Sequence, residues 1–225
     1  CVNMASRKYI ILHGLTLRHS RTTAVFAQNA ENCEIRDCVF RAIGKGTDTD
    51  NYGIDARYSG SMRISLNSMD RSEGLFNASG IVVNLFGRAN TSPGFSYVEN
   101  NRITGIEVDA VVTGNNVVVS RNTIGNLLNK ATHSDGIVVQ GSNVTVKRNT
   151  VFDCTQCVYV NSFDYGPGSE SVCDNVAVLG NLIYGTAAAH KTGVNGISVW
   201  VFGAGLASIN GLKIYNNTIA DCNFN

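Results

Sequence analysis

The sequence predicts an all-β solenoid, in which a coil of three short strands repeats about eight times along the 225 residues. Three observations predict this fold class: an asparagine that recurs in a fixed apolar frame, alternating apolar residues on both sides of it, and unequal spacing between the copies. The recurring asparagines, which we call the anchors, are Asn67, Asn101, Asn122, Asn149, Asn181 and Asn217.

Each anchor lies in the pattern apolar-x-x-Asn-x-apolar, as in Val146 to Val151, and two earlier copies keep the frame but carry Cys38 and Leu15 instead. Apolar residues at every second position are typical of a half-buried strand, so the frame predicts one strand before the anchor and one after it. Consecutive anchors are 21 residues apart (Asn101 to Asn122) to 36 residues apart (Asn181 to Asn217). This variation excludes helical-hairpin repeats of fixed length and indicates coils with loops of different size.

A third apolar run precedes each pair of strands, for example 79–83, 135–139 and 195–199. Three strands per coil, stacked many times, give a parallel β-solenoid. Asparagine suits a sharp turn because it tolerates the left-handed backbone region and can bond its own backbone. Coils stack about 4.8 Å apart, so we expect the anchor side chains to bond one above another in a buried ladder.

At this level of detail the sequence resembles the pectate-lyase-like superfamily of right-handed parallel β-helices. The segment that carries the resemblance best is 135–151, which gives the first strand, a turn, the second strand, the anchor and the third strand in that order. The resemblance covers roughly residues 9–222. It implies one right-handed β-helix domain over residues 1–225 and an extracellular or cell-surface location, but it implies little about activity, because this fold serves many functions.

The composition limits the partners that the chain can have. A net charge of +1 gives no electrostatic argument for nucleic acid or an anionic membrane. No apolar stretch reaches the roughly 18 residues that a membrane-spanning helix needs. Neither end carries an amphipathic capping helix, so we expect an excerpt of a longer solenoid, or neighbouring coils or subunits that cover both ends.

The chain has seven cysteines, an odd number. Cys33 and Cys38 fall at inward positions and are interpreted as small buried apolar residues. Two alternatives stay open for the others: a disulfide between Cys157 and Cys173, or seven free thiols.

The first strand of each coil offers a candidate binding face. With Ile137 and Val139 pointing inward, two outward columns follow. One column is Phe26, Asp55, Val82, Val111, Val138, Tyr159 and Ser198, and the other is Gln28, Arg57, Asn84, Thr113, Gln140, Asn161 and Trp200.

Amides can hydrogen-bond sugar hydroxyls, and exposed aromatic rings can stack on the apolar face of a sugar. The residues expected to contact a polysaccharide are therefore Asn84, Gln140, Tyr159, Asn161 and Trp200.

The candidate catalytic residues are Arg57 and Asp55. Arg57 would serve a lyase as base or as charge neutraliser, and Asp48, Asp50 and Asp55 supply oxygens that could hold Ca²⁺. The outward acids Asp55 and Asp109 are expected roughly 12 Å apart, which is too far for the carboxylate pair of a glycoside hydrolase. Aspartate and asparagine also gather in turns for backbone reasons alone.

Two functions stay open at this point. The first is a β-helix protein that binds, and as a lyase or hydrolase also cleaves, polysaccharide. The second is a non-catalytic structural or adhesive segment of a larger surface, fibre or tailspike-like assembly, which the missing caps and missing carboxylate pair favour.

Overall fold

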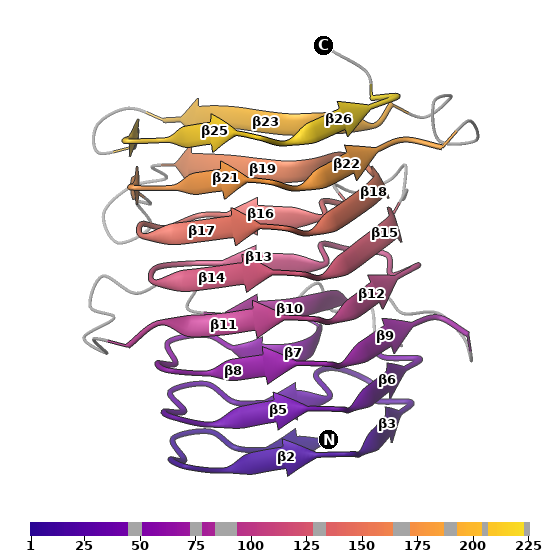
Figure 1. Cartoon of the computed structure of the whole chain (residues 1–225). Helices are drawn as coiled ribbons and strands as arrows, with labels where there is room; N and C mark the ends of the chain where they lie inside the picture. The colour runs from indigo at the N-terminus through magenta and orange to yellow at the C-terminus, as the bar shows by residue number, and fades with distance from the viewer. Residues whose placement is uncertain are drawn as a thin grey trace.

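The chain forms a right-handed parallel β-helix, in a computed structural model that describes residues 1–44, 51–72, 78–83, 94–127, 134–163, 172–186, 193–203 and 207–222. Three parallel sheets of eight strands each run along the helix, and a further pair of strands lies beside them. No helix occurs within the described ranges. The coils follow one another in chain order from the N-terminal to the C-terminal end (Figure 1). The predicted fold class is therefore confirmed.

The first sheet contains β1 (Val2–Asn3), β4 (Val25–Phe26), β7 (Tyr52–Ala56), β10 (Ser79–Val83), β13 (Val111–Thr113), β16 (Ile137–Val139), β19 (Gln156–Phe163) and β23 (Asn195–Phe202). The second sheet contains β2 (Ile11–His13), β5 (Glu34–Arg36), β8 (Arg63–Ser65), β11 (Ser96–Glu99), β14 (Val117–Ser120), β17 (Val144–Lys147), β21 (Ala177–Leu179) and β25 (Lys213–Tyr215). The third sheet contains β3 (Thr16–Arg18), β6 (Val39–Arg41), β9 (Ser68–Asp70), β12 (Arg102–Thr104), β15 (Thr123–Leu127), β18 (Thr150–Cys154), β22 (Leu182–Tyr184) and β26 (Thr218–Ala220). The separate pair is β20 (Val172–Asp174) with β24 (Ser208–Asn210).

The core is a set of apolar columns, because every strand pairs in register with the strand one coil away. In the first sheet, Ile81 pairs with Val111 and Val111 pairs with Ile137, and all three side chains are fully buried. The positions predicted to point inward, Ile137 and Val139, are confirmed at 0% exposure. Burial of this kind contributes about 1.5–3 kcal/mol for each large aliphatic side chain.

The asparagine ladder is present and runs between the second and third sheets. The Asn149 Oδ1 atom accepts hydrogen bonds from the Asn122 backbone N–H (2.9 Å) and from its Nδ2 (3.0 Å). The Asn149 Nδ2 atom donates to Val119 O and to Asn181 Oδ1, both at 3.0 Å. The same pattern joins each anchor from Asn67 to Asn217, and at the N-terminal end the Cys38 backbone N–H donates to Asn67 Oδ1. Every buried polar group of the ladder is thereby paired.

The left-handed backbone that we expected at the anchors falls one residue earlier. Leu66, Asn100, Arg121, Arg148 and Asn216 have φ between 56° and 58°, and Gly180 has φ 62°. The anchors themselves are absent from this region of φ. The preceding residue makes the bend, which leaves the asparagine free to turn its amide into the ladder.

A column of small residues forms the corner that leads into the first sheet. A Cβ atom on Gly80 would lie 2.4 Å from Ala110 O, and one on Gly136 would lie 2.5 Å from Cys157 O. Both distances are well below van der Waals contact. These two positions therefore require glycine, and the corner places the residue just before it, such as Asp135, on the outer side.

All seven cysteines are free, so the alternative with no disulfide is confirmed and the Cys157–Cys173 bond is not formed. The Cys173 thiol instead donates to Asn161 O (3.5 Å) and Val139 O (3.7 Å). Its burial raises its pKa to about 12. Cys33 and Cys38 are 2% and 0% exposed, as expected for small core residues.

We expect Asn149→Leu to destabilise the protein by about 1–3 kcal/mol, because it leaves the Asn122 amide, the Asn122 backbone N–H and Val119 O unpaired in the core. Chemical denaturation measures the change. Thr145→Leu is the control, because Thr145 is half-buried on β17 of the neighbouring sheet and has no part in the ladder. An Asn149→Leu variant as stable as the control would show that the ladder contributes nothing.

Candidate functional site

The outer face of the first sheet carries most of the residues predicted to act on a ligand, but one part of the predicted columns was out of register. Val82 pairs with Val112 and not with Val111, so Val112 lies in the outward column. Val111 and Thr113 point into the core at 0% exposure. The prediction of these two residues as outward was wrong. Val111, Val112 and Thr113 show no alternation of apolar and polar residues, so the sequence does not indicate which of them face out.

The middle of this outer face is apolar and buried. Val82, Val112 and Val138 form one cluster with Tyr52 and Tyr159, apart from the main core, and each is at most 9% exposed. These residues therefore do not form a continuous open groove along the whole column. The exposed polar and aromatic groups lie at the two ends of the column.

At the N-terminal end, Asp55, Arg57 and Gln28 form a compact hydrogen-bonded group. Arg57 Nε donates to Asp55 Oδ1 (3.0 Å) and Arg57 Nη2 donates to Asp55 Oδ2 (2.9 Å). Gln28 Nε2 donates to Asp55 Oδ2 (2.8 Å), and the Arg57 guanidinium lies 4.9 Å from the centre of the Tyr52 ring. Asp55 is 1% exposed, so these contacts supply the pairing that a buried carboxylate needs.

These contacts affect the roles expected of Arg57, as base or charge neutraliser, and of Asp55, as a Ca²⁺ ligand. The hydrogen bonds to Asp55 raise the pKa of the Arg57 guanidinium, which favours a permanent positive charge over a base. Both Asp55 oxygens already accept hydrogen bonds. Asp48 and Asp50, the other residues expected to hold Ca²⁺, lie outside the described residues. Among the described residues, no three His, Cys, Asp or Glu side chains gather as a metal site.

At the C-terminal end, an aromatic cluster holds Trp200 at the surface. The Tyr159 and Trp200 rings meet edge to face with centroids 6.1 Å apart, and Trp200 lies 5.1 Å from Phe202. Tyr159 is 7% exposed, whereas Trp200 is 48% exposed. Tyr159 and Phe202 thus support the tryptophan, and Trp200 offers the open ring face.

Two amides share the column of Trp200. Register places Asn161 beside Trp200, and the pairing of Val139 with Val160 places Gln140 beside Asn161. Gln140 is half-buried and Asn161 is 7% exposed. Asn84, the other amide expected in this column, lies outside the described residues. An aromatic ring next to side-chain amides can present both an apolar surface and hydrogen-bonding groups to one ligand.

Two stacked aspartates on the same sheet form a feature that the sequence reasoning missed. The Asp135 backbone N–H donates to Asp109 Oδ1 (3.0 Å), and the Ala110 N–H donates to Asp135 O, so the two residues are neighbours one coil apart. Asp135 is 2% exposed and its Oδ1 has no hydrogen-bond partner. Burial, together with the charge of Asp109, raises the pKa of Asp135 to about 7.

A signal for this pair was present in the sequence. Asp109 and Asp135 each precede a small residue and a β-branched residue, in Asp109-Ala-Val and Asp135-Gly-Ile. Asp55, the acid that the sequence analysis compares with Asp109, is not its counterpart. Register through Ser79 aligns Asp109 with Tyr52, and Asp55 lies three residues after Tyr52. Alignment of Ala110 with Gly136, the small residues at the corner, places Asp109 beside Asp135.

Comparison with solved structures shows that the chain shares its fold with other proteins. The tailspike protein of E. coli bacteriophage HK620, solved as a mutant in complex with a hexasaccharide, aligns with 97% of this chain at a TM-score of 0.61 and 14% identity. A double mutant of a periplasmic alginate epimerase aligns with 88% at a TM-score of 0.52 and 14% identity. The alignments cover 43% and 47% of those chains, so this chain spans less than half of their lengths. At this identity the likeness establishes a shared right-handed parallel β-helix.

No protein-family model matches the chain, and no curated protein matches it significantly in sequence. Within the described ranges, no helix is long and apolar enough to cross a membrane.

We expect Asp135→Asn to stabilise the protein at pH 8 and to have little effect near pH 4. The folded state holds the Asp135 proton up to a pKa of about 7, above the ordinary 3.8, so the folded state binds more protons between these values. Stability therefore falls as the pH rises through this window, and a neutral asparagine removes the loss. Urea unfolding at several pH values measures it, with Asp221→Asn at the surface as control. A stability difference between variant and wild type that does not change with pH would contradict the raised pKa.

Proposed function

We propose that this protein binds polysaccharide at an extracellular or cell-surface location, through the outer face of its first sheet. The observation that carries the proposal is the half-exposed Trp200, which Tyr159 and Phe202 hold in place beside the amides of Asn161 and Gln140. An exposed tryptophan forgoes burial worth several kcal/mol unless a ligand covers it. The fold shared with an alginate epimerase and with a hexasaccharide-bound tailspike supports the same substrate class.

Within this proposal, Arg57 and Asp55 form the charged end of the surface. Arg57 is 22% exposed in its side chain and keeps its charge, so it would neutralise a sugar carboxylate that lies along the sheet. Asp55 would orient the guanidinium. A catalytic role for the two residues is the step beyond binding, and the polymer assay below tests it.

A second candidate is a non-catalytic segment of a larger surface assembly. Ile214 and Ile219 stand at inward positions of the last coil, where they pair with the buried Val178 and Ile183, yet they are 45% and 39% exposed. A partner subunit stacked on these apolar positions would remove them from water. Such an assembly could still bind polysaccharide, but unlike an enzyme it would not cleave it.

We expect Trp200→Ala to weaken binding of any recognised polysaccharide by roughly fivefold or more, because the ring supplies the main apolar contact. Isothermal titration against a panel of neutral and uronate polymers measures the effect. Tyr97→Ala is the matched control, because Tyr97 is a similarly exposed aromatic (43%) on β11 of the second sheet. Equal losses in both variants would show that the first sheet has no special part in binding.

The two candidate functions differ in an assay for cleavage. If Arg57 and Asp55 are catalytic, uronate polymers yield unsaturated or shortened products, and Arg57→Ala abolishes them. The Arg57→Lys variant, which keeps the charge but not the paired hydrogen bonds, separates neutralisation from folding defects. Binding without products from any polymer would rule out the catalytic role and support the assembly.

A further inference from the structure

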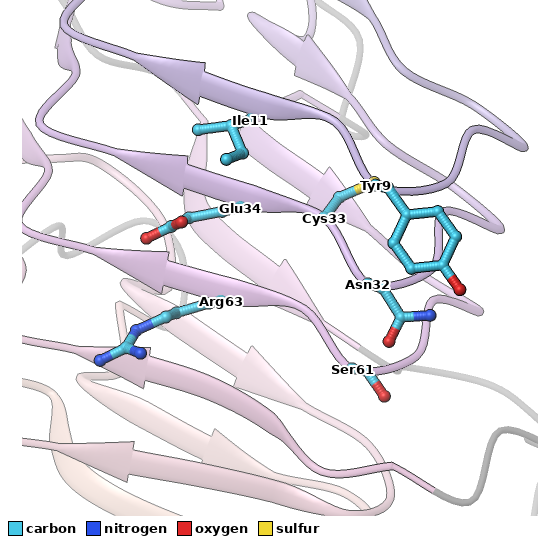
Figure 2. A pocket seen from close by; sticks show the side chains of 7 residues that line it. All are labelled: Tyr9, Ile11, Asn32, Cys33, Glu34, Ser61 and Arg63. Atoms are coloured by element: carbon cyan, nitrogen blue, oxygen red, sulfur yellow. The ribbon is translucent and has the colours of Figure 1, made fainter.

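A hollow of about 400 Å³ lies on the outer side of the second sheet, in the first three coils. It is lined by Tyr9, Ile11, Asn32, Cys33, Glu34, Ser61 and Arg63. Figure 2 shows two groups of lining side chains: Ile11, Glu34 and Arg63 stacked on β2, β5 and β8, and Tyr9, Asn32 and Ser61 at the turns before these strands. The hollow is shallow and open to solvent, so it would cover one side of a small ligand and leave the other side in water.

Tyr9 is unusual for the position that it occupies. In six other coils the residue at this corner has positive φ, and it is Asn32, Ser61, Asn116, Asn143, Asn175 or Gly211. The β11 coil has Phe95 at the same register, and Phe95 is not in the positive-φ region. Asparagine and glycine adopt this conformation readily, whereas a bulky side chain does so at a cost. Tyr9 has φ 61°, so a tyrosine adopts a left-handed conformation that asparagine would adopt more readily.

Packing does not explain the tyrosine. Its side chain is 75% exposed, the highest value among the large apolar side chains in the described part of the chain. Residues held in unfavourable backbone conformations without a packing reason gather at functional sites. The exposed ring is therefore available to a ligand in the hollow.

The hollow also offers two polar side chains, Asn32 and Ser61. The Asn32 amide and the Ser61 hydroxyl have no hydrogen-bond partner among the described residues, and both lie on the same side as Tyr9 (Figure 2). Together they supply donors and acceptors for at least two ligand hydroxyls. Ile11, 61% exposed, adds an apolar surface on the opposite side.

The two charged side chains that line the hollow, Glu34 and Arg63, each have an oppositely charged partner, although the partner of Arg63, Glu99, also pairs with Arg121. Arg63 Nη2 lies 2.6 Å from Glu99 Oε1, and Glu34 Oε1 lies 3.7 Å from Arg36 Nε. At the corner, Lys8 Nζ lies 2.7 Å from Glu31 Oε2. Among the residues that the structure describes, neither charged side chain of the lining is without an oppositely charged partner, so the lining favours an uncharged ligand.

We propose that this hollow is a second carbohydrate site, which takes a neutral pyranose ring stacked on Tyr9 with its hydroxyls on Asn32 and Ser61. The three strands span roughly 10 Å, which admits one or two sugar rings. The site lies on a different sheet from Trp200 and at the opposite end of the solenoid, so it does not rest on the function proposed for the first sheet (Figure 1).

The two sites can be observed separately, because Trp200 is the sole tryptophan of the chain. Methyl β-D-glucopyranoside and methyl β-D-galactopyranoside serve as neutral probes, with sodium glucuronate as the charged counterpart. NMR shifts of the Tyr9 ring protons report the hollow, and tryptophan fluorescence reports the first sheet. We expect a neutral glycoside to shift the Tyr9 signals with a dissociation constant on the order of 1 mM or weaker, and glucuronate to bind less well.

Tyr9→Asn is the decisive variant, because asparagine suits the corner and the fold should be preserved or stabilised. We expect a melting temperature at or above that of wild type and at least about a tenfold loss of glycoside affinity. Tyr58→Asn is the matched control: Tyr58 also has positive φ (59°) and is exposed (45%), but it does not line the hollow. It should leave the affinity unchanged.

Three results would overturn the proposal: no Tyr9 shift with either glycoside at saturating concentration, unchanged glycoside affinity in Tyr9→Asn, or tighter binding of glucuronate than of both glycosides. A Tyr9 response without any change in Trp200 fluorescence, also with the polymer panel, would support the second site while removing support for binding at the first sheet.

Discussion

The hydrogen bond from each anchor's backbone N–H to the Oδ1 atom of the next anchor is the contact on which the rest of the structure depends. It joins consecutive coils inside the core, at 2.9–3.0 Å from Cys38 to Asn217, where a buried polar group without a partner would cost about 1–3 kcal/mol. A shift of one residue in any coil would break this contact and reverse the faces of the adjoining strands. The ladder therefore fixes register in the second and third sheets, which adjoin it, even though the loops between coils differ greatly in length.

Fixed register brings equivalent residues into contact, whether or not their contact is favourable. In the core it stacks Ile81, Val111 and Ile137 and stabilises the solenoid. On the outer face it stacks Asp109 and Asp135, and burial together with the charge of Asp109 raises the pKa of Asp135. A buried pair of stacked carboxylates is less unfavourable when one member is neutral, so ionisation of Asp135 at high pH lowers the stability of the fold.

The repeat, the three strands per coil and the ladder could all be predicted from the sequence, because the apolar frame around the anchors is local and periodic. The register of β13 could not, since Val111, Val112 and Thr113 carry no alternation to show which residue faces inward. The aromatic end at Trp200 was predicted, but the burial of Val82 and Val138 was not, because outward position and exposure are different properties. The hollow at Tyr9 was missed because its residues come from three coils and become related only through the positive-φ corner.

The ladder also has a direction, with a consequence for how such a chain can change. In each coil the backbone N–H at the anchor position donates to the side-chain Oδ1 atom of the following anchor. A coil on the N-terminal side can therefore join the ladder without a side-chain amide, as the coil of Cys38 does through its backbone N–H. A coil that joins the C-terminal side must bring an acceptor for the Asn217 N–H. Duplication or truncation of coils is thus freer at one end of the rod than at the other, and sequence drift at the anchor should collect in the coils that come first.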